Sequence, residues 1–143
     1  MKFKLLSAER WKTFAIVFDK DDEFTTTLLE FATRQHLKGS HFTGVGAFKA
    51  LSFGFFEREQ KDYRKIEINE QVEVMSLTGT VTTTDSGPKV HSHVVIGKRD
   101  GTAHGGHLLQ GHVWPTLELI LTEFPVELHR VIDDETRLPL ISL

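Results

Sequence analysis

The pattern of apolar and polar positions first predicts a buried strand followed by an amphipathic helix. Residues 10–18 are rich in β-branched and aromatic side chains, as is typical of a buried strand. Between residues 23 and 38, apolar side chains recur at the spacing of one helix face: Phe24, Leu28, Phe31 and Ala32. We therefore predict a strand over residues 10–18 and a helix over residues 23–38.

The predicted helix has candidate capping residues at both ends. Asp22 precedes it and is suited to the N-cap, where a side-chain oxygen accepts hydrogen bonds from free backbone N–H groups. Lys38 suits the negative end of the helix dipole, and Gly39 suits the left-handed conformation in which many helices end. We expect the helix to lie between these residues.

After Gly39, the pattern is that of β-strands throughout. After Val45-Gly46-Ala47-Phe48, the residues Leu51, Phe53 and Phe55 form one apolar face, and Phe56 lies on the opposite face. Further strands are predicted over residues 62–68, 71–83, 89–97, 102–110, 112–123 and 125–132, with a candidate bulge at Gly79.

Two strongly marked turns separate these strands. One is Asp85-Ser86-Gly87-Pro88, and the other is Lys98-Arg99-Asp100-Gly101, whose Asp-Gly pair suits the positive φ values of a type I′ turn. The elements together predict an α+β fold, a mostly antiparallel β-sheet packed with one principal α-helix. We expect a single domain over residues 1–143.

Composition narrows the chemistry that this fold can carry. The chain has no cysteine, which excludes disulfides, thiol catalysis and thiolate metal sites, so any metal must have nitrogen and oxygen ligands. The net charge of −3 argues against a surface that binds many phosphates. No signal peptide or membrane-spanning run is recognisable, so we expect a cytoplasmic protein without membrane contact.

Three histidines lie around the second turn. His91 and His93 are two residues apart in a predicted strand, so their side chains point to the same face, roughly 6–7 Å apart. A regular two-residue turn would place His107 on the opposite face, and a one-residue bulge at Gly105-Gly106 would bring it back. The pattern predicts one divalent metal site, with zinc the first candidate.

The other histidines offer weaker candidates, and a His-x-His pair alone is more often a surface or core feature. His104 is expected to be exposed, although a fourth ligand or a supporting group is the alternative, and His112 is a further candidate. Surface or packing roles are expected for His36, His41 and His129.

A longer motif surrounds the three histidines. It comprises His91-Ser92-His93, Asp100-Gly101, and the run from Gly105-Gly106-His107-Leu108 to Gly111-His112-Val113, flanked by Glu73–Gly79 and Thr116–Leu119. Over about residues 10–131 the sequence resembles the plants-and-prokaryotes conserved (PPC) domain family. The resemblance implies an α+β domain that forms homotrimers, in which His91, His93 and His107 bind a metal, usually zinc.

The same resemblance bears on DNA binding. Plant members of the family lack these histidines and carry an Arg-Gly-Arg-Pro element that enters the minor groove of DNA. This chain has no such element. A DNA-binding role would therefore rest on family analogy.

The sequence leaves three functions open. The first is a metal-dependent enzyme or small-molecule binder with hydrolase-type chemistry, because three histidines leave a fourth zinc position open. Its candidate acids or bases are Glu73 and Glu118, which interrupt apolar strands, although structural or solvent-facing carboxylates are the alternative. The second is a DNA-associated regulatory protein with the trimer as its platform, and the third is a purely structural metal.

Apolar groups at two places give independent support for self-association. Phe55 and Phe56 occupy both faces of one strand, and the tail Leu138-Pro139-Leu140-Ile141-Ser142-Leu143 is apolar. A neighbouring subunit could cover both. The alternative is a tail folded onto its own core.

Overall fold

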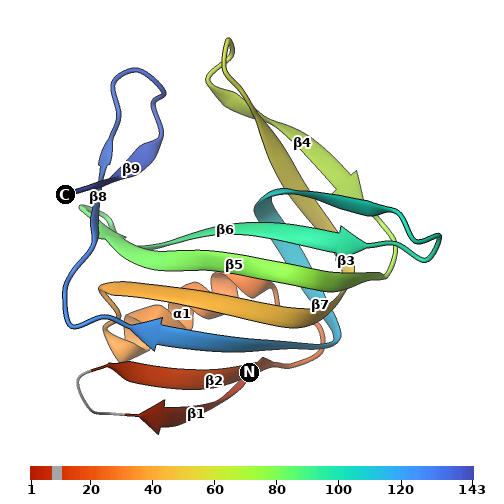
Figure 1. Ribbon diagram of the computed structural model, residues 1–143, viewed down its shortest axis with the longest axis horizontal. Coiled ribbons are helices and arrows are strands. Elements are labelled where there is room, and N and C mark those ends of the chain that lie inside the picture. The colour runs from red at the N-terminus through yellow and green to blue at the C-terminus, as the bar shows by residue number, and fades with distance from the viewer. Residues whose placement is uncertain (8–10) are drawn as a thin grey trace.

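The computed structural model describes residues 1–7 and 11–143, which form one nine-stranded sheet and one helix (Figure 1). The strands are β1 (Lys2–Ser7), β2 (Lys12–Phe18), β3 (Gly39–Glu57), β4 (Asp62–Ile68), β5 (Val72–Thr84), β6 (Gly87–Gly97), β7 (Ala103–Glu123), β8 (His129–Ile132) and β9 (Pro139–Ser142), and the helix is α1 (Phe24–Gln35). All named strand pairs are antiparallel except β5 with β8. The predicted α+β fold is confirmed.

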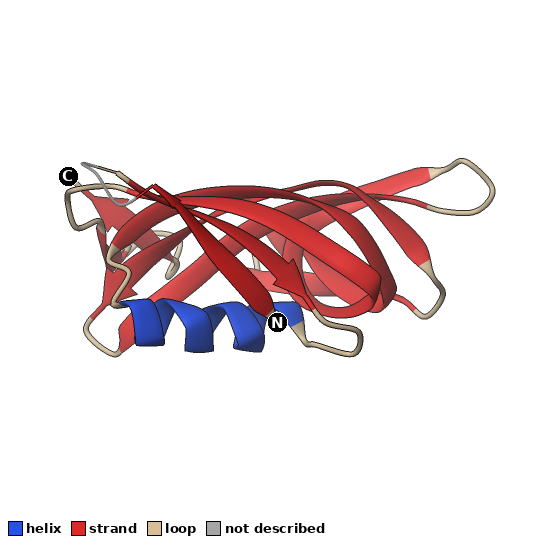
Figure 2. Cartoon of the chain, turned by 90° about the horizontal axis from the view of Figure 1, so that it is seen from below, coloured by secondary structure: helices blue, strands red, loops and turns tan. Residues whose placement is uncertain are grey.

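The sheet closes a circuit of four strands. Strand β3 pairs with both β5 and β7, and β6 pairs with the outer sides of the same two strands. The long β7 makes this closure feasible, because its first residues, Ala103–His107, pair with β6 and its last, Leu117–Glu123, pair with β2. Helix α1 lies along one face of the sheet (Figure 2).

The buried face of α1 is the one that the sequence predicts. Phe24, Leu28, Phe31 and Ala32 are all fully buried. The ring of Phe24 lies 5.4 Å from that of Phe18 and 5.9 Å from that of Phe42, which joins the helix to β2 and β3. Each buried phenylalanine contributes about 1.5–3 kcal/mol through the hydrophobic effect. No helix of the described residues has the length and apolarity to cross a membrane.

The predicted helix caps were wrong at both ends. Glu23, and not Asp22, is the N-cap, and its carboxylate accepts hydrogen bonds from the N–H groups of Thr25 and Thr26. At the other end, His36 adopts the left-handed conformation with φ 54°. The helix therefore ends before Gly39, which is already the first residue of β3.

Other predicted elements differ in their bounds. The strand predicted over residues 10–18 is β2, and residue 10 lies outside the described residues. The two strands predicted over 102–110 and 112–123 are one continuous strand, β7. Gly111 does not interrupt it, and a Cβ there would lie 2.6 Å from the ring of Phe48.

The predicted bulge at Gly79 is also wrong. Gly79 pairs regularly with Phe42 and Ser92, and the irregularity in β5 lies between Val74 and Ser76.

The predicted apolar face formed by Leu51, Phe53 and Phe55 is confirmed only in part. Leu51 and Phe53 are buried, whereas Phe55 is exposed where the β3–β4 hairpin projects beyond the sheet (Figure 1).

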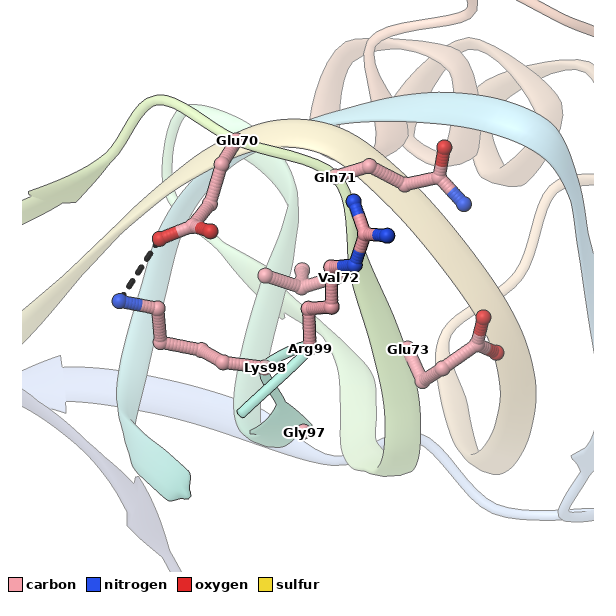
Figure 3. A pocket seen from close by; sticks show the side chains of 7 residues that line it. All are labelled: Glu70, Gln71, Val72, Glu73, Gly97, Lys98 and Arg99. Atoms are coloured by element: carbon pink, nitrogen blue, oxygen red, sulfur yellow. Dashed lines mark ion pairs between the residues drawn. The ribbon is translucent and has the colours of Figure 1, made fainter. Parts of the chain in front are cut away.

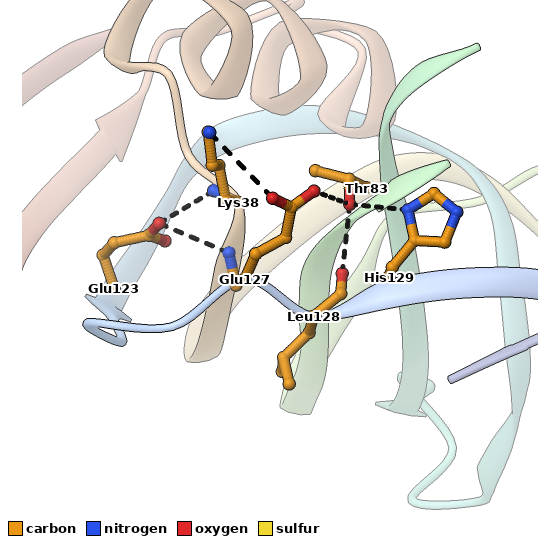
Figure 4. A network of polar contacts seen from close by, with 7 residues as sticks. Lys38, Thr83, Glu123, Glu127, Leu128 and His129 are labelled. Atoms are coloured by element: carbon orange, nitrogen blue, oxygen red, sulfur yellow. Dashed lines mark hydrogen bonds and ion pairs between the residues drawn. The ribbon is translucent and has the colours of Figure 1, made fainter. Parts of the chain in front are cut away.

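A polar network holds the segment between β7 and β8 against the sheet (Figure 4). Glu123 accepts hydrogen bonds from the backbone N–H groups of Lys38 and Gly39, at 2.7 and 3.3 Å. Thr83 of β5 donates to Glu127 at 2.6 Å, and its oxygen lies 3.0 Å from Nδ1 of His129. Strand β8 is thereby fixed beside the end of β5.

Candidate metal centre

The three histidines are positioned by the β6–β7 hairpin. His93 pairs directly with His107 across the two strands. His91 precedes His93 by two residues in β6, and alternation places it on the same face. The structure therefore brings together all three residues that the sequence singles out.

The pairing of His93 with His107 requires one residue more than a two-residue turn provides, and this residue lies in the turn. Between Lys98 and Thr102, Gly101 alone has a positive φ, +83°, and its N–H donates to the carbonyl of Lys98. This is a three-residue loop whose glycine is left-handed, not the predicted type I′ turn. The predicted bulge at Gly105-Gly106 is wrong, because both residues pair regularly with β6.

Gly105 and Gly106 instead allow neighbouring strands to approach closely. A Cβ at Gly105 would lie 2.5 Å from the carbonyl oxygen of Val94, and one at Gly106 would lie 2.7 Å from that of Gly54. Real Cβ atoms do not approach backbone oxygens so closely. The two glycines thus let β6 and β3 lie close to β7 on either side just before His107.

The three imidazole rings are close enough to share one ion. Their centroids lie 5.3 Å apart for His91 and His93, 5.0 Å for His91 and His107, and 5.5 Å for His93 and His107. One nitrogen from each ring lies within 4.8 Å of the others. His91 and His107 are half-buried, whereas His93 is exposed, so the cluster is open to solvent on one side.

Tyr63 fixes the ring of His107. The two rings stack with centroids 4.5 Å apart and planes 19° from parallel. Gly54 of β3 pairs with His107 of β7. A Cβ on Gly54 would lie 2.8 Å from the Tyr63 ring. The missing side chain therefore gives the tyrosine of β4 room to lie across β3 and reach the histidine.

Arg130 of β8 is a buried cation beside His91. Its Nη2 lies 3.3 Å from Nδ1 of His91 and donates to the hydroxyl of Thr80 at 3.1 Å. Its Nε donates to Thr82 at 2.8 Å, and its Nη1 donates to the carbonyl of Pro139 at 2.8 Å. All these acceptors are uncharged, although only 7% of the residue's surface is exposed.

The electrostatic environment favours the neutral imidazoles of His91 and His107. Burial lowers the pKa of His91 to about 4, and the positive charge of Arg130 adds to this effect. Burial also lowers the pKa of His107 to about 4, and the neighbouring histidines and Lys89 contribute in the same direction. A metal binds the neutral form of imidazole, so two of the three residues are ready to bind a metal well below neutral pH.

The donor set fits a divalent ion such as zinc. Nδ1 of His107 is buried and has no hydrogen-bond partner among the described residues. A buried polar atom without a partner is costly, and a metal at that nitrogen or a hydrogen-bond acceptor next to it would remove the cost. Three imidazoles with one side open are the ligand set that zinc takes when a fourth position is left for another molecule.

A small hollow of about 210 Å³ opens against two of the histidines. Its walls come from five strands: Tyr63 of β4, Lys89 and His91 of β6, His107 of β7, Arg130 of β8, and the end of the chain at Leu138, Pro139 and Leu140. The lining combines polar and charged side chains with the apolar residues of the tail. The tail therefore contributes a wall to the site, in addition to any contact with other subunits.

Neither predicted carboxylate lies beside the histidines. Glu73 pairs with Gly97. It lies five residues before Thr78, and Thr78 is the residue of β5 that pairs with His93. At about 3.3 Å per residue, this separation is roughly 16 Å along the strand. The role of Glu73 as an acid or base stays a prediction that the geometry does not favour.

Glu73 and Glu118 line other hollows. Glu73 faces a hollow of about 460 Å³ together with Lys98, Arg99 and Glu70, where Lys98 and Glu70 form an ion pair of 2.7 Å (Figure 3). Glu118 pairs with Val17 and Val45 on the exposed face of the sheet. Both side chains are exposed, as the alternative interpretation of the sequence expects.

The remaining histidines lie apart from the cluster. His104 is exposed near Thr102, as expected. His112 forms a bridge with Glu23, at the start of the helix. His36 caps the helix, His41 stacks on Phe124, and His129 lies beside Thr83.

Sequence reasoning missed Arg130, Tyr63 and Lys89 as parts of the site. Lys89 precedes His91 by two residues, so strand alternation was a usable signal for it. Arg130 and Tyr63 come from β8 and β4, and no local pattern links those strands to β6 or β7. Only the tertiary fold brings them to the histidines.

Comparison with known proteins places this site in context. The sequence matches the model of the Plants and Prokaryotes Conserved (PCC) domain over residues 6–125. The structure is similar to a plant- and prokaryote-conserved (PPC) protein from Pyrococcus horikoshii, with 28% identity and a TM-score of 0.87 over 99% of this chain and 95% of that one. No curated protein matches the sequence.

Two further solved structures are similar over most of their length. A metal-containing protein from Archaeoglobus fulgidus is 30% identical, with a TM-score of 0.86 and coverage of 100% of both chains. A candidate DNA-binding protein from Ralstonia eutropha JMP134 is 25% identical, with a TM-score of 0.85 over 91% of this chain and 90% of that one.

Proposed function

The chain belongs to the Plants and Prokaryotes Conserved domain family, and on that premise we propose that it binds one divalent metal, zinc in the first instance, through His91, His93 and His107. One observation carries the proposal: a nitrogen of each ring lies within 4.8 Å of the other two. The metal-containing relative from Archaeoglobus fulgidus, similar over its whole length, supports it.

The surrounding residues define what the site would do with a small molecule. When bound, zinc in such a site supplies a Lewis acid for a carbonyl or phosphoryl oxygen and can activate water. Tyr63 orients the ring of His107, and residues 138–140 contribute apolar lining to the hollow. We infer a binding site for a small molecule, with hydrolase-type chemistry as the reaction class.

Metal analysis tests the first part of the proposal. Protein purified without chelators or a metal-affinity column should carry about one zinc ion per chain. H93A removes an exposed ligand and should weaken zinc binding by two or more orders of magnitude, whereas H104A, in the same hairpin, should match the wild type. Equal zinc affinity in H93A and wild type would refute the site.

A substrate screen tests the reaction class. Zinc-loaded wild type should hydrolyse some small ester, lactone or phosphoester, and H93A should not. E73Q and E118Q test the two carboxylates, and we expect both variants to keep the wild-type rate because neither lies beside the histidines. Identical signals from wild type and H93A across the screen would leave a binding role only.

A DNA-associated regulatory role is the second candidate. It is favoured by the relative from Ralstonia eutropha, which is described as a candidate DNA-binding protein. The net charge of −3 opposes it. A gel-shift assay across salt concentrations tests this role, because binding through phosphate contacts weakens steeply as the salt concentration rises. The absence of a shift at low ionic strength would refute it.

Homotrimer assembly is supported by an apolar patch on the exposed sheet face. Val17, Val45, Met75 and Ile120 are 38–62% exposed and surround a hollow of about 640 Å³. Exposed apolar patches mark interaction sites, and we infer that other copies of the chain cover this one. Light scattering should give three times the chain mass of 16.3 kDa. V45D should lower that mass, and Q60D, in an exposed turn, should not.

The expected cytoplasmic location stays a prediction. Fractionation of cells that express a tagged chain would test it. Recovery of the chain from the membrane pellet would contradict it.

A further inference from the structure

We propose that Arg130 recognises the negatively charged end of a small carboxylate that occupies the hollow beside the three histidines. The inference rests on the proposed metal site and names the class of molecule that this site accepts. Three features support the inference. Arg130 has no counter-charge, a metal would change the contact of Arg130 with His91, and the size and lining of the hollow suit a small anion.

Arg130 has no acidic partner within residues 1–7 and 11–143. Its donors reach the hydroxyl groups of Thr80 and Thr82, the carbonyl of Pro139 and Nδ1 of His91. A buried charge is usually paired, because its desolvation is costly when only neutral groups surround it. A guanidinium that lines a hollow without a carboxylate partner therefore favours an anion as the missing partner.

Metal binding would also free one donor of Arg130. Arginine can only donate, so its 3.3 Å contact with His91 uses the lone pair of Nδ1. If that nitrogen takes the metal, the lone pair is no longer available. If Nε2 takes the metal, the single proton of the neutral ring moves to Nδ1, which again cannot accept. In both cases the N–H of Arg130 needs another acceptor.

The charges around the hollow point to the same class of ligand. Lys89 also lines it, so it has two cationic side chains before any metal is added, and no acidic residue is among its lining residues. A divalent ion on three neutral imidazoles would add further positive charge. An anion that approaches both the ion and Arg130 would offset this charge.

The size of the hollow limits the ligand. A volume of about 210 Å³ lies below the ~300–1,000 Å³ of sites that hold drug-sized ligands, which favours a small molecule. Leu138 and Leu140 add apolar lining to the hollow, which the two cationic side chains also line. A carboxylic acid with a short alkyl chain matches both kinds of lining, and the planar guanidinium suits the planar carboxylate.

A purely structural role for Arg130 is the competing explanation. Its bonds to Thr82 and Pro139 tie the β8–β9 hairpin to β5, and that role alone needs no ligand. The two explanations differ in what happens when an anion is added. A structural tie predicts no specific binding, and a recognition residue predicts binding that depends on Arg130 and on the charge of the ligand.

Isothermal titration of zinc-loaded protein with propionate tests the inference. We expect saturable binding by wild type and no binding of propionamide, which has the same shape without the charge. R130Q should bind propionate about 10- to 100-fold more weakly, in line with the loss of a charge-assisted hydrogen bond. K89Q should bind about threefold more weakly, and R58Q, at an exposed turn, should equal the wild type.

The outcomes separate this inference from the metal site. Zinc affinity is measured first, and R130Q should keep it within about threefold of wild type. Zinc-loaded R130Q that binds propionate as tightly as wild type overturns the role of Arg130 and leaves the metal site intact. Wild-type chain that binds no zinc overturns both proposals. Tighter binding of inorganic phosphate than of propionate overturns the choice of carboxylate.

A measurement on the wild type keeps the test decisive if R130Q does not fold. The Nε–H signal of Arg130 should be visible by NMR because the group is buried and bonded to Thr82. Propionate should shift that signal saturably in zinc-loaded protein. An unchanged signal at concentrations that saturate the calorimetric titration overturns the inference.

Discussion

His93 lies directly opposite His107 in the pairing of β6 with β7, whereas His91 is offset from this pair by two residues. The histidine cluster is therefore one cross-strand pair plus one diagonal neighbour. Opposite residues on two antiparallel strands have Cβ atoms about 4.5–5.5 Å apart, and diagonal neighbours are farther apart. The cluster owes its geometry to strand register more than to side-chain packing.

Cysteine cross-linking tests this register. H93C/H107C should form a disulfide on mild oxidation because its side chains lie opposite each other, and H91C/H107C should form one far more slowly. The native chain contains no cysteine, so a thiol assay on each variant reports the engineered pair alone. Faster oxidation of H91C/H107C would contradict the register.

The lowered pKa of His91 and His107 predicts how the metal-free protein responds to acid. Both side chains stay neutral in the fold down to about pH 4, whereas in the unfolded chain they take up protons below about pH 6.5. The unfolded state therefore binds more protons between these values, and the free energy of unfolding falls as the pH drops from 6.5 to 4. The loss should be about 1 kcal/mol per histidine, after discounting for solvent screening of half-buried groups.

Urea unfolding of chelator-treated protein at pH 7, 5.5 and 4.5 measures this loss. Carboxylates also titrate toward the low end of the range, so the comparison is with H91Q/H107Q. The double variant should lose less stability over the same interval. Equal losses in the two proteins would show that these histidines do not respond to acid as inferred.

Gly54 provides a test of how Tyr63 supports the site. In G54A the new Cβ would lie 2.8 Å from the tyrosine ring, so the ring must leave its place against His107. We expect zinc affinity to fall by about tenfold, the lower end of the effect of losing a supporting contact. Y63A should show a similar loss, and Y63F should behave as the wild type. Unchanged zinc affinity in G54A and Y63A would remove the tyrosine from the site.

Glu23 joins the helix to the sheet, and its loss should be measurable. Its carboxylate accepts hydrogen bonds from the N–H groups of Thr25 and Thr26 at 3.2 and 2.8 Å, and from Gly111 of β7 at 3.2 Å. E23A should lower the free energy of unfolding by about 1–2 kcal/mol. E30A, at an exposed position of the same helix, should change it by less than about 0.5 kcal/mol in thermal or urea unfolding.

The sequence predicts those features that depend on neighbours along the chain. The helical stripe at Phe24 and Leu28 and the histidine hairpin are of this kind, because periodicity reports directly which side chains share a face. The predicted caps failed for a physical reason. The carboxylate of Asp22 accepts a hydrogen bond from the N–H of Asp19, and this leaves Glu23 to cap the helix.

Features that depend on distant strands could not be predicted in this way. Gly111 has the sequence signature of a break, but the ring of Phe48 lies over it and the strand continues. Arg130 reaches His91 only because β8 runs beside β5, through the pairing of Thr83 with His129. A single sequence carries no periodic signal for such a contact.

The placement of Arg130 and the wall at residues 138–140 has a consequence for how the site is completed. A ribosome releases the β6–β7 hairpin before these residues, and His93 and His107 pair within that hairpin. A growing chain can therefore assemble the imidazoles while the side later closed by β9 is still missing. If both proposals hold, ion binding depends on β6 and β7, whereas selection of the second ligand depends on the β8–β9 hairpin, which is synthesised later.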